Sequence, residues 1–560
     1  MVIARKISLK NGAWKKLSSR ALPFFFCFVL CFEAGCASDS NQLKLSRSDY
    51  QRDEFVKAES ELYTPEVFKQ AKNRLLHYYF LSSIAMSEGQ FEKAVYFLNK
   101  ARDQANSVRS SNGTFEWFSS NYLSNPIEYS YIHSMLVMAY SLLAEAGNTP
   151  AWNTPEIRDE KGNILVPAQT FAARTYDNRD IAGFRSKARS ELLAWDSFLQ
   201  MMRNTYPTGN YYKEDLWARM LASYVLGHSS DTNDRNSAVI LTQDMQKIFQ
   251  KEFTRYPSAS QNQAQIEAIM KKLKTQASGK APLQSLLVCE AGVMSTYKTQ
   301  RYVLGLSTLF GQIQDPGLRR AFEEVGMRSL LTFAPEFGLI ALGGGIAGAI
   351  SGGTDNDNDE IEGPPKYFTD AIDRSFGFEV RFPALRFPPS DTEVSMSFSK
   401  PGAPAQTVKM AVVSPLQEMI ATELKAREGK EMLGKAVTIG IEYIAILVPA
   451  IKAYKAAEGN VLKKIGILAA YYMAKKAIDA ANSPDLRSWN FLPKVIAADV
   501  VDLPPGDYDA KLMISNHFGR DERAVGKVTL GDPNKAIQLK RVGDVPILNR
   551  LDSASHAPVH

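Results

Sequence analysis

The sequence predicts an α+β protein with a helical N-terminal half and a β-rich C-terminal half. Residues 57–276 carry apolar side chains at helical spacing almost throughout. Residues 376–413 instead alternate apolar and polar side chains, as half-buried strands do, and further strands are expected within 495–540. An apolar helical stretch at 415–482 separates these two strand regions. The chain has 560 residues and 45% hydrophobic content, which is enough for two to four domains with sizeable cores.

The first 35 residues have the pattern of an export signal. Six basic residues and no acid occur in residues 1–20, and about a dozen mostly apolar residues follow at 21–32. That apolar run is too short to cross a hydrocarbon core of about 30 Å as a helix. We therefore expect residues 1–35 to be a signal peptide that is removed.

The motif Ala34-Gly35-Cys36 ends this region and resembles the lipobox of bacterial lipoproteins. The resemblance implies that Cys36 is lipidated, with acyl chains such as palmitate, and two or more chains hold a protein stably on a membrane. Glu33 stands where the motif usually has Leu, so ordinary cleavage after Ala37, which gives a free periplasmic protein, is the alternative. Ala37 itself resembles the signal for sorting to the outer membrane. Residues 36–56 are polar and are predicted to form a tether.

Charge and cysteine content exclude several functions. The net charge is +6, but the first 35 residues hold six basic residues and one acid, which leaves only +1 for the remainder. A near-neutral body lacks the basic surface that nucleic-acid binding requires. Cys27 and Cys31 lie in the signal and Cys36 at the anchor, so only Cys289 remains, and its apolar neighbours predict a buried hydrophobe rather than a nucleophile. The six His residues are scattered, and neither a metal nor a cofactor is expected.

In the helical half, residues 89–101 resemble the second half of a tetratricopeptide repeat (TPR). The upstream helix supplies small and aromatic residues at the other usual positions of that repeat. Two further helix pairs follow, with insertions near 106–126 and 147–178. The expected pairs are 129–145 with 184–202 and 212–227 with 238–253, and a capping helix is expected at 263–276. About three stacked pairs predict a TPR-like α-solenoid, whose concave groove, lined by the first helix of each pair, binds a protein partner. The alternative is a helical bundle that only supports the other half.

The second domain is predicted to span 277–545 and to be followed by a disordered tail at 546–560. Short strands are expected at 283–288 and 302–305, around the turn Glu290-Ala291-Gly292. The helical insert at 415–482 is expected to break near Gly429 and again near Gly459-Asn460. Because the two β regions flank this insert, they are expected to pair in one small sheet or sandwich, with the inserted helices packed on one face.

A Gly-rich segment at 337–353 permits several interpretations. Gly343, Gly345 and Gly348 match the spacing of a dinucleotide-binding loop, but that loop needs a helix directly after it, and a run of Asp and Asn begins at Asp355. Small residues four apart also suit helix packing in membranes, so a membrane-inserting subunit of an oligomeric complex is a further alternative. A buried Gly-rich helix or loop is the favoured interpretation.

Several stretches together resemble a family of uncharacterised bacterial lipoproteins with a TPR-like N-terminal half. The most specific stretch is 483–493, Ser-Pro-Asp-Leu-Arg-Ser-Trp-Asn-Phe-Leu-Pro, which is followed by a Leu-Pro-Pro-Gly turn at 503–506. Residues 287–292 also match. The sequence departs from the family at Ser295, where the family tends to have Pro. The resemblance implies an envelope location and a scaffold-like body, and it supplies no catalytic residues.

The same stretches contain the candidate site. Asp485, Arg487 and Trp489 lie where the helical insert ends and strands resume, which predicts an Asp–Arg pair and a Trp that plugs the helix–sheet junction. Glu290 and Gly292 are predicted to form a turn. A binding or catalytic role for these residues is the alternative.

The sequence therefore predicts a lipid-anchored envelope protein, placed on the outer membrane facing the periplasm, that acts as a scaffold and binds another envelope protein through its helical groove. The rival hypothesis is an enzyme acting on envelope polymers, which requires acids such as Glu290 or Asp485 to face one another in a cleft.

Overall fold

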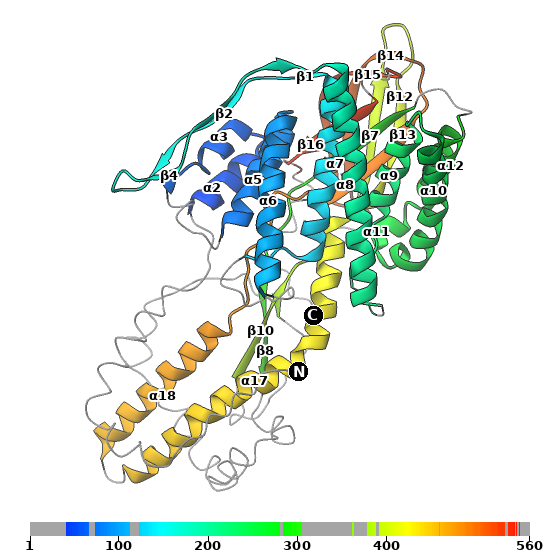
Figure 1. Cartoon of the computed structure of the whole chain (residues 1–560). Coiled ribbons are helices and arrows are strands. Elements are labelled where there is room, and N and C mark those ends of the chain that lie inside the picture. The colour runs from blue at the N-terminus through cyan, green and yellow to red at the C-terminus, as the bar shows by residue number, and fades with distance from the viewer. Residues whose placement is uncertain are drawn as a thin grey trace.

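The computed structural model describes residues 41–65, 73–112, 122–207, 209, 211–279, 284–304, 361–362, 378–387, 391–457, 460–532, 536–543, 545 and 548. Over these residues the chain is α+β, as predicted (Figure 1). The predicted signal peptide, Cys36 and the Gly-rich segment at 337–353 lie outside the described residues.

Helices of the N-terminal half pack one on the next in chain order (Figure 1). They are α2 (Asn41–Gln51), α3 (Phe55–Ser60), α5 (Arg74–Ser87), α6 (Phe91–Asn112), α7 (Pro126–Ala146), α8 (Asn178–Thr205), α9 (Leu216–Gly227), α10 (Thr232–Glu252), the short turns η4 (Phe253–Arg255) and α11 (Pro257–Ser260), and α12 (Gln263–Ala277). Local sequence explains their ends: α7 begins with a capping box formed by Asn125 and Glu128 and ends at Gly147, whose φ is 64°. The expected partners in 129–145 and 184–202 thus lie within α7 and α8, which pack together.

The insertion at 147–178 is a β-ribbon rather than a loop. Its strands are β1 (Asn148–Thr149), β2 (Trp152–Thr154), β3 (Ile157–Arg158), β4 (Ile164–Val166), β5 (Gln169–Phe171) and β6 (Arg174–Thr175). They form nested antiparallel pairs. The ring of Trp152 stacks on that of Phe171 at 3.8 Å, and Tyr96 of α6 packs against both rings, so the base of the ribbon is held on the helical stack.

Seven strands form one nearly closed sheet in the C-terminal half. They are β7 (Ser285–Ala291), β11 (Glu393–Ser399), β12 (Gln406–Ser414), β13 (Val495–Val501), β14 (Gly506–Asn516), β15 (Gly519–Leu530) and β16 (Ile537–Val542), in the spatial order β15-β14-β11-β12-β13-β7-β16. All neighbours are antiparallel except β16 and β7, which are parallel. The pairing of β11 with β14 and of β12 with β13 confirms that these parts of the two β regions join in one sheet, whereas the strand at 378–384 lies in a separate sheet.

Side-chain alternation gives this sheet two apolar faces. On the inner face Cys289, Met396, Leu512 and Val528 pack together as the sheet curls on itself. Residues of the other face, such as Val288, belong to the core of the helical stack, because α9, α11 and α12 pack over β12 and α12 over β13. The sheet is therefore covered mainly by N-terminal helices.

The helical insert forms an arm that leaves the body (Figure 1). It consists of α17 (Leu416–Ala456) and α18 (Val461–Ala481), beside a second sheet of β8 (Lys298–Leu304), β9 (Ile361–Glu362) and β10 (Phe378–Ala384). Only the root of α17, residues 416–424, is buried in the core of the body. The expectation that the inserted helices pack on one face of the main sheet is therefore wrong beyond this root. The expected break at Gly429 is also wrong, since α17 runs through it, whereas the break near Asn460 is confirmed.

Both ends of the described chain pack onto the body. In α2, Leu43 and Tyr50 are buried, and the ring of Tyr50 stacks on that of Phe491 at 4.1 Å. The predicted tether at 36–56 is therefore wrong from residue 41 onward, because two well-placed apolar side chains suffice to dock a polar helix. Within the predicted disordered tail, Leu548 is buried and its carbonyl accepts a hydrogen bond from Lys494 Nζ at 2.7 Å. The prediction of disorder is wrong at this residue.

Candidate functional site

Trp489 is fully buried between the first helices of the stack and the sheet. Its ring stacks on Tyr79 of α5 at 4.0 Å and meets Tyr131 of α7 edge-on at 5.4 Å. The indole Nε1 donates to Ser83 Oγ at 2.9 Å, and the backbone N–H donates to Glu128 Oε1 at 2.8 Å. The predicted plug at the helix–sheet junction is confirmed, and its polar atoms are satisfied from two helices.

Asp485 and Arg487 form the predicted pair. Arg487 Nε lies 2.8 Å from Asp485 Oδ1 and Nη2 lies 2.6 Å from Oδ2, a two-pronged geometry that matches guanidinium to carboxylate. Arg487 Nη1 also donates to Asn73 Oδ1 at 2.6 Å, and its Cζ lies 5.8 Å from the centre of the Tyr122 ring. The Arg487 side chain is 2% exposed, so its charge is neutralised inside the protein.

Glu290 pairs with an arginine that the sequence did not point to. Arg541 Nε of β16 lies 2.6 Å from Glu290 Oε2 of β7, the strand to which β16 is paired in parallel. Arg541 Nη1 donates to the carbonyl of Ser83 at 2.9 Å. Ser83 therefore contacts both Trp489 and Arg541, and it joins the two parts of the predicted site. We call the set Ser83, Glu128, Glu290, Asp485, Arg487, Trp489 and Arg541 the junction.

Gly292 makes the turn that follows Glu290. Its φ is +75°, a left-handed value that favours glycine, and its N–H donates to Val542 O at 2.9 Å. A Cβ at this position would lie 3.2 Å from both Leu548 and Lys494 side-chain atoms. The glycine is therefore needed for backbone shape and for close packing.

Glu128 belongs to a group of carboxylates that sequence reasoning missed. Each accepts a backbone N–H from a distant part of the chain. The pairs are Glu128 with Trp489 N at 2.8 Å, Glu145 with Ile537 N at 3.1 Å, Glu418 with Ser258 N at 3.3 Å and Glu423 with Tyr212 N at 2.6 Å. Burial raises the pKa of Glu128, Glu145 and Glu418 to about 7, although their hydrogen bonds act in the opposite direction. The available signal was an acid within a strongly apolar helix, as at Glu128.

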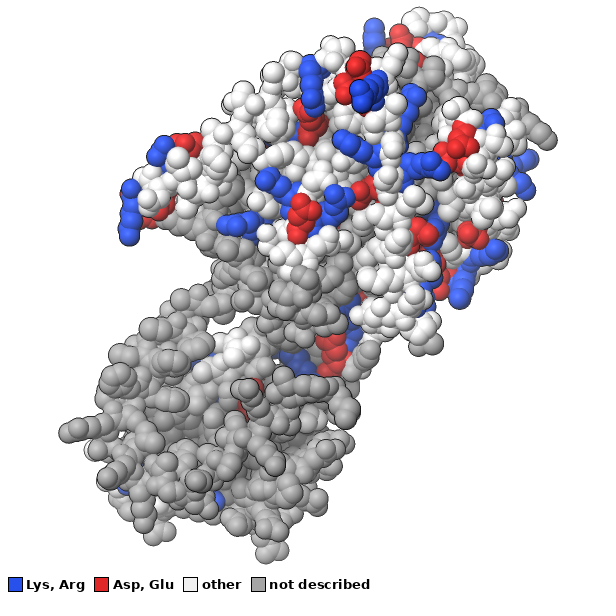
Figure 2. Space-filling view, viewed as in Figure 1, with Lys and Arg blue, Asp and Glu red and all other residues white. Residues whose placement is uncertain are grey.

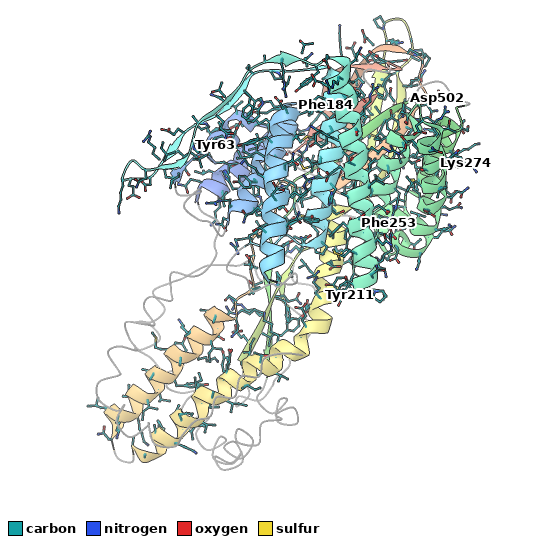
Figure 3. The ribbon with its side chains drawn as sticks, in the orientation of Figure 1. Tyr63, Phe184, Tyr211, Phe253, Lys274 and Asp502 are labelled. Atoms are coloured by element: carbon teal, nitrogen blue, oxygen red, sulfur yellow. The ribbon has the colours of Figure 1, made fainter. Side chains whose placement is uncertain are left out.

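These contacts run along the whole boundary between the helices and the rest of the chain. Near one end, Tyr211 lies beside α17, and the next residue, Tyr212, is held by Glu423 (Figure 3). At the other end, Lys274 and Asp502 mark where α12 meets the sheet, and Lys272 Nζ lies 3.0 Å from Asp499 Oδ1 (Figure 3). The two halves are thus joined by specific polar contacts as well as by a shared apolar core.

The geometry of the junction suits a structural role and not a catalytic one. Catalytic acids need to reach a substrate, whereas Glu290 and Asp485 each hold an arginine in the interior. The expectation that these acids face one another across a cleft is therefore wrong. Cys289 is fully buried, which confirms the predicted buried hydrophobe, and this burial raises the pKa of its thiol to about 12. Among the described residues, no group of three or more His, Cys, Asp or Glu is placed to hold a metal ion.

The expected groove is filled by the chain itself. Most side chains of α5, α7 and α9, the first helices of the expected pairs, are buried. Trp489 covers α5 and α7, while Tyr224 of α9 donates from its hydroxyl to the carbonyls of Gln284 and Ala536, at 2.8 Å each. An open groove lined by the first helices is therefore wrong for the described residues.

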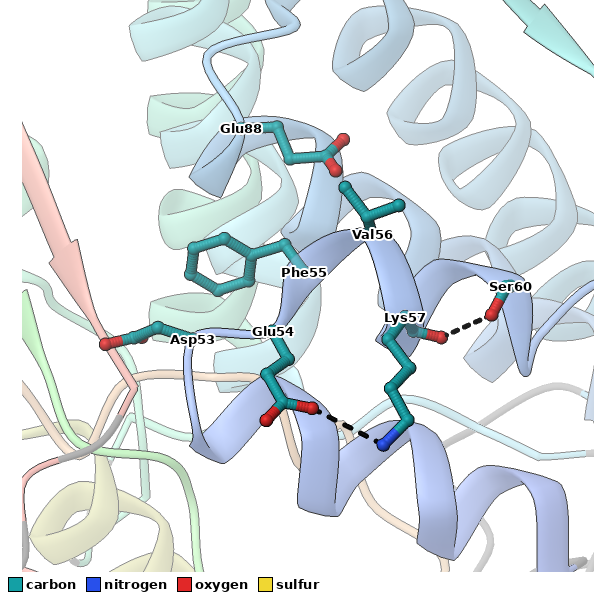
Figure 4. Close-up of a pocket in the computed structure, with 7 residues that line it drawn as sticks. All are labelled: Asp53, Glu54, Phe55, Val56, Lys57, Ser60 and Glu88. Carbon is teal, nitrogen blue, oxygen red and sulfur yellow. Dashed lines mark hydrogen bonds and ion pairs between the residues drawn. The ribbon is translucent and has the colours of Figure 1, made fainter.

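A surface depression lies at α3 and the end of α5, with a volume of about 550 Å³ (Figure 4). Its lining residues are Asp53, Glu54, Phe55, Val56, Lys57, Ser60 and Glu88. Lys57 Nζ bonds Glu54 Oε2 at 3.4 Å and Asp49 Oδ1 at 3.1 Å. None of the predicted site residues lines this depression, and its lysine is already engaged by its own neighbours.

Charges on the face shown in Figure 2 are mixed. Lys and Arg are interspersed with Asp and Glu over the described part of the body, and no large area of that face has a single sign (Figure 2). This distribution gives a nucleic-acid backbone no basic track on that face.

Comparisons with protein-family models, with curated proteins and with solved structures found no match to this chain.

Proposed function

We propose that this chain is a lipid-anchored envelope protein, attached through Cys36 and facing the periplasm, that acts as a protein-binding scaffold in a periplasmic or outer-membrane assembly. Its helices α5 to α10 would form a TPR-like solenoid of three pairs, as the motif at 89–101 suggests. The resemblance of residues 483–493 to bacterial lipoproteins supports the same location. The buried junction supports a scaffold, because it makes the helical stack and the sheet one cohesive body.

We assign the partner-binding surface to the helices that face outward from the stack. With α5, α7 and α9 covered, the second helices α6, α8 and α10 are the ones that face outward. Leu193 and Met201 of α8 and Ile240 of α10 are 65%, 42% and 58% exposed. An ion pair of 2.6 Å between Arg189 and Asp234 links the same two helices. Exposed apolar side chains beside charged pairs are typical of protein-binding surfaces. The surface formed by Leu193, Met201 and Ile240 is the observation that carries the proposal.

The short connection to the proposed anchor fits a scaffold held at a membrane. Only five residues run from Cys36 to the first residue of α2, Asn41. Fully extended, they reach about 17 Å. A protein anchored at Cys36 would keep its body close to the bilayer, and its partner would be met there.

Site-specific crosslinking tests the proposal. A photoreactive residue at position 193 or 240 should crosslink one protein in the native envelope, and the same group at Ile164, an exposed apolar residue of the ribbon, should not. The double variant Leu193→Glu/Ile240→Glu should lose that partner in a pull-down, while Ile164→Glu retains it. A Cys36→Ala variant should lose metabolic labelling with palmitate. Equal crosslinking at 164, 193 and 240, or a partner kept by the double variant, would overturn the assigned surface.

A further inference from the structure

The arm carries apolar surface that the body does not cover. Among the described helices, the segment Gly434–Tyr454 of α17 is long and apolar enough to cross a membrane by length and composition, yet only 39% of it is buried. One side packs on Phe378 and Phe382 of β10 and on Leu468 and Tyr471 of α18. Val437, Ile446 and Ala450 are partly buried against the same cluster, whereas Ala445, Pro449 and Ala453 are exposed.

The same region concentrates positive charge. Residues 443–478 contain six lysines and a single acid, Glu458, whereas the whole chain after residue 35 has a net charge of only +1. The basic residues are Lys452, Lys455, Lys463, Lys464, Lys475 and Lys476. Two acids flank this region, Glu442 of α17 and Asp479 of α18. Both bond within the arm, Glu442 to Asn482 and Asp479 to Tyr443. The outer part of the arm is therefore a local basic element on a nearly neutral protein.

Two lysines of the arm lie over tyrosine rings, of which Tyr454 is buried and Tyr472 is 39% exposed. Lys464 Nζ lies 4.7 Å from the centre of the Tyr454 ring, and Lys476 Nζ lies 5.4 Å from that of Tyr472. At the tip, Leu462 is 83% exposed beside Lys463, whose N–H is capped by Asn460 Oδ1 at 2.9 Å. Aliphatic and aromatic groups next to ammonium groups suit the boundary between lipid headgroups and acyl chains.

The first helix of the described chain contacts the segment that leads into the arm's small sheet. Arg47 Nη2 of α2 donates to Met294 O at 3.0 Å, just before β8 begins. Strand β8 pairs with β10, which packs on α17. From Gly434 to Ala456 the helix extends about 34 Å. An arm of this length can reach a surface well beyond the body.

We propose that the outer part of the arm, residues 446–476, lies on a bilayer surface that contains anionic phospholipid. The lysine ammonium groups meet lipid phosphates, and Leu462 with the neighbouring apolar side chains enters the interface. Charge complementarity selects this occupant, since a basic apolar hairpin matches an anionic lipid surface. The contact goes beyond the scaffold proposal and does not require an acylated Cys36.

Vesicle sedimentation tests this contact with the chain from residue 37 onward, which carries no acyl group. It should bind vesicles of phosphatidylcholine with phosphatidylglycerol and bind pure phosphatidylcholine far more weakly. Replacing Lys452, Lys463, Lys464 and Lys476 with Gln should weaken binding by roughly several hundredfold at low salt, since each lysine near an anionic surface contributes roughly fivefold. A matched variant with Lys247, Lys251, Lys271 and Lys274 changed to Gln removes the same charge from α10 and α12 and should bind normally. Thermal unfolding shows that both variants fold.

A second measurement places the tip. A polarity-sensitive fluorophore on Leu462→Cys should shift to the blue on anionic vesicles, and the same probe on Leu193→Cys should not. Equal loss of binding in the two lysine variants would indicate general electrostatic attraction and overturn the proposal. Absence of binding to anionic vesicles, or equal binding to neutral ones, would overturn it as well.

Discussion

The indole nitrogen of Trp489 donates a hydrogen bond to the hydroxyl of Ser83 at 2.9 Å, although 406 positions separate the two residues in the chain. The carbonyl of the same Ser83 accepts from Arg541. One turn of α5 thus connects the segment after the arm with the last strand of the sheet. Long-range contacts of this kind make the helices and the sheet depend on each other.

Replacing Trp489 should therefore destabilise the whole body. Trp489→Ala removes the stacking on Tyr79 and leaves a cavity, which should cost about 3–5 kcal/mol. Trp489→Phe keeps an aromatic ring and loses the bond to Ser83, so its cost should be nearer 1 kcal/mol. Urea unfolding followed by circular dichroism measures both. A cost below 1 kcal/mol for the alanine variant would show that the junction does not hold the halves together.

The Glu290–Arg541 pair should show strong coupling. Arg541→Met leaves the Glu290 carboxylate buried without its partner and should cost about 3–5 kcal/mol. Adding Glu290→Gln to that variant should restore much of the loss, because the unpaired charge is then gone. Lys409→Met breaks the exposed pair with Glu393 and should change the free energy of unfolding by less than about 1 kcal/mol. Additive losses in the double variant would contradict the coupling.

Periodicity predicted which segments are helices and strands because it is a local property. The expected helix at 263–276 matches α12, and the alternation at 393–398 matches β11. It did not predict α2, where only a few residues such as Leu43 and Tyr50 are buried in a polar helix. Nor did it predict that α17 continues through Gly429. The low helix propensity of glycine costs about 1 kcal/mol there, and it is offset by the packing of the α17 segments before and after this residue.

The candidate site was also predictable in part, because some of its contacts are local in sequence. Asp485 and Arg487 are two residues apart, so their pairing is a local matter. Periodicity shows that a helix face is buried but not what buries it, so α5 and α7 were expected to line an open groove that Trp489 in fact fills. Ser83 and Arg541, the long-range partners, have no local signal.

Gly292 should tolerate substitution less well than another left-handed glycine. Gly292→Ala meets both a strained φ of +75° and side chains of Leu548 and Lys494 at 3.2 Å. Gly147→Ala meets only the strain, since its φ is +64° and no atom lies within 4 Å of the added Cβ. The strain costs about 1–2 kcal/mol at either position, so Gly292→Ala should be the more destabilising. Equal midpoints in urea would show that the turn relaxes without cost.

The buried carboxyls predict that stability rises as the pH falls from 8 to 6.5. Burial raises the pKa of Glu145 and Glu418 to about 7, from 4.5. The folded chain therefore binds protons that the unfolded chain releases above pH 4.5, and each carboxyl favours folding more as the pH decreases through 7. His77 acts in the opposite direction. Burial lowers its pKa from 6.5 to about 3, so His77 reduces the free energy of unfolding only when the pH falls below 6.5. The free energy of unfolding should increase by up to about 1 kcal/mol per pH unit and per carboxyl.

Glutamine variants separate this effect from the general charge of the protein. Glu145→Gln and Glu418→Gln should each reduce the slope of unfolding free energy against pH between 6.5 and 8. Glu267→Gln changes an exposed acid of α12 and should leave the slope unaltered. A slope that is unchanged in both buried variants would show that these carboxyls stay ionised in the folded chain.

Cys289 should resist thiol reagents until the sheet opens. Its side chain is fully buried on the inner face of the sheet, between Leu287 and Ala291 of the same strand, and burial raises its pKa to about 12. In the chain from residue 37 onward it is the sole cysteine, so labelling by a chromogenic disulfide reports on it alone. We expect no reaction in native buffer and stoichiometric reaction in denaturant, with a rate that rises in Trp489→Ala if the junction supports the sheet. Rapid labelling of the native chain would show that the inner face opens without unfolding.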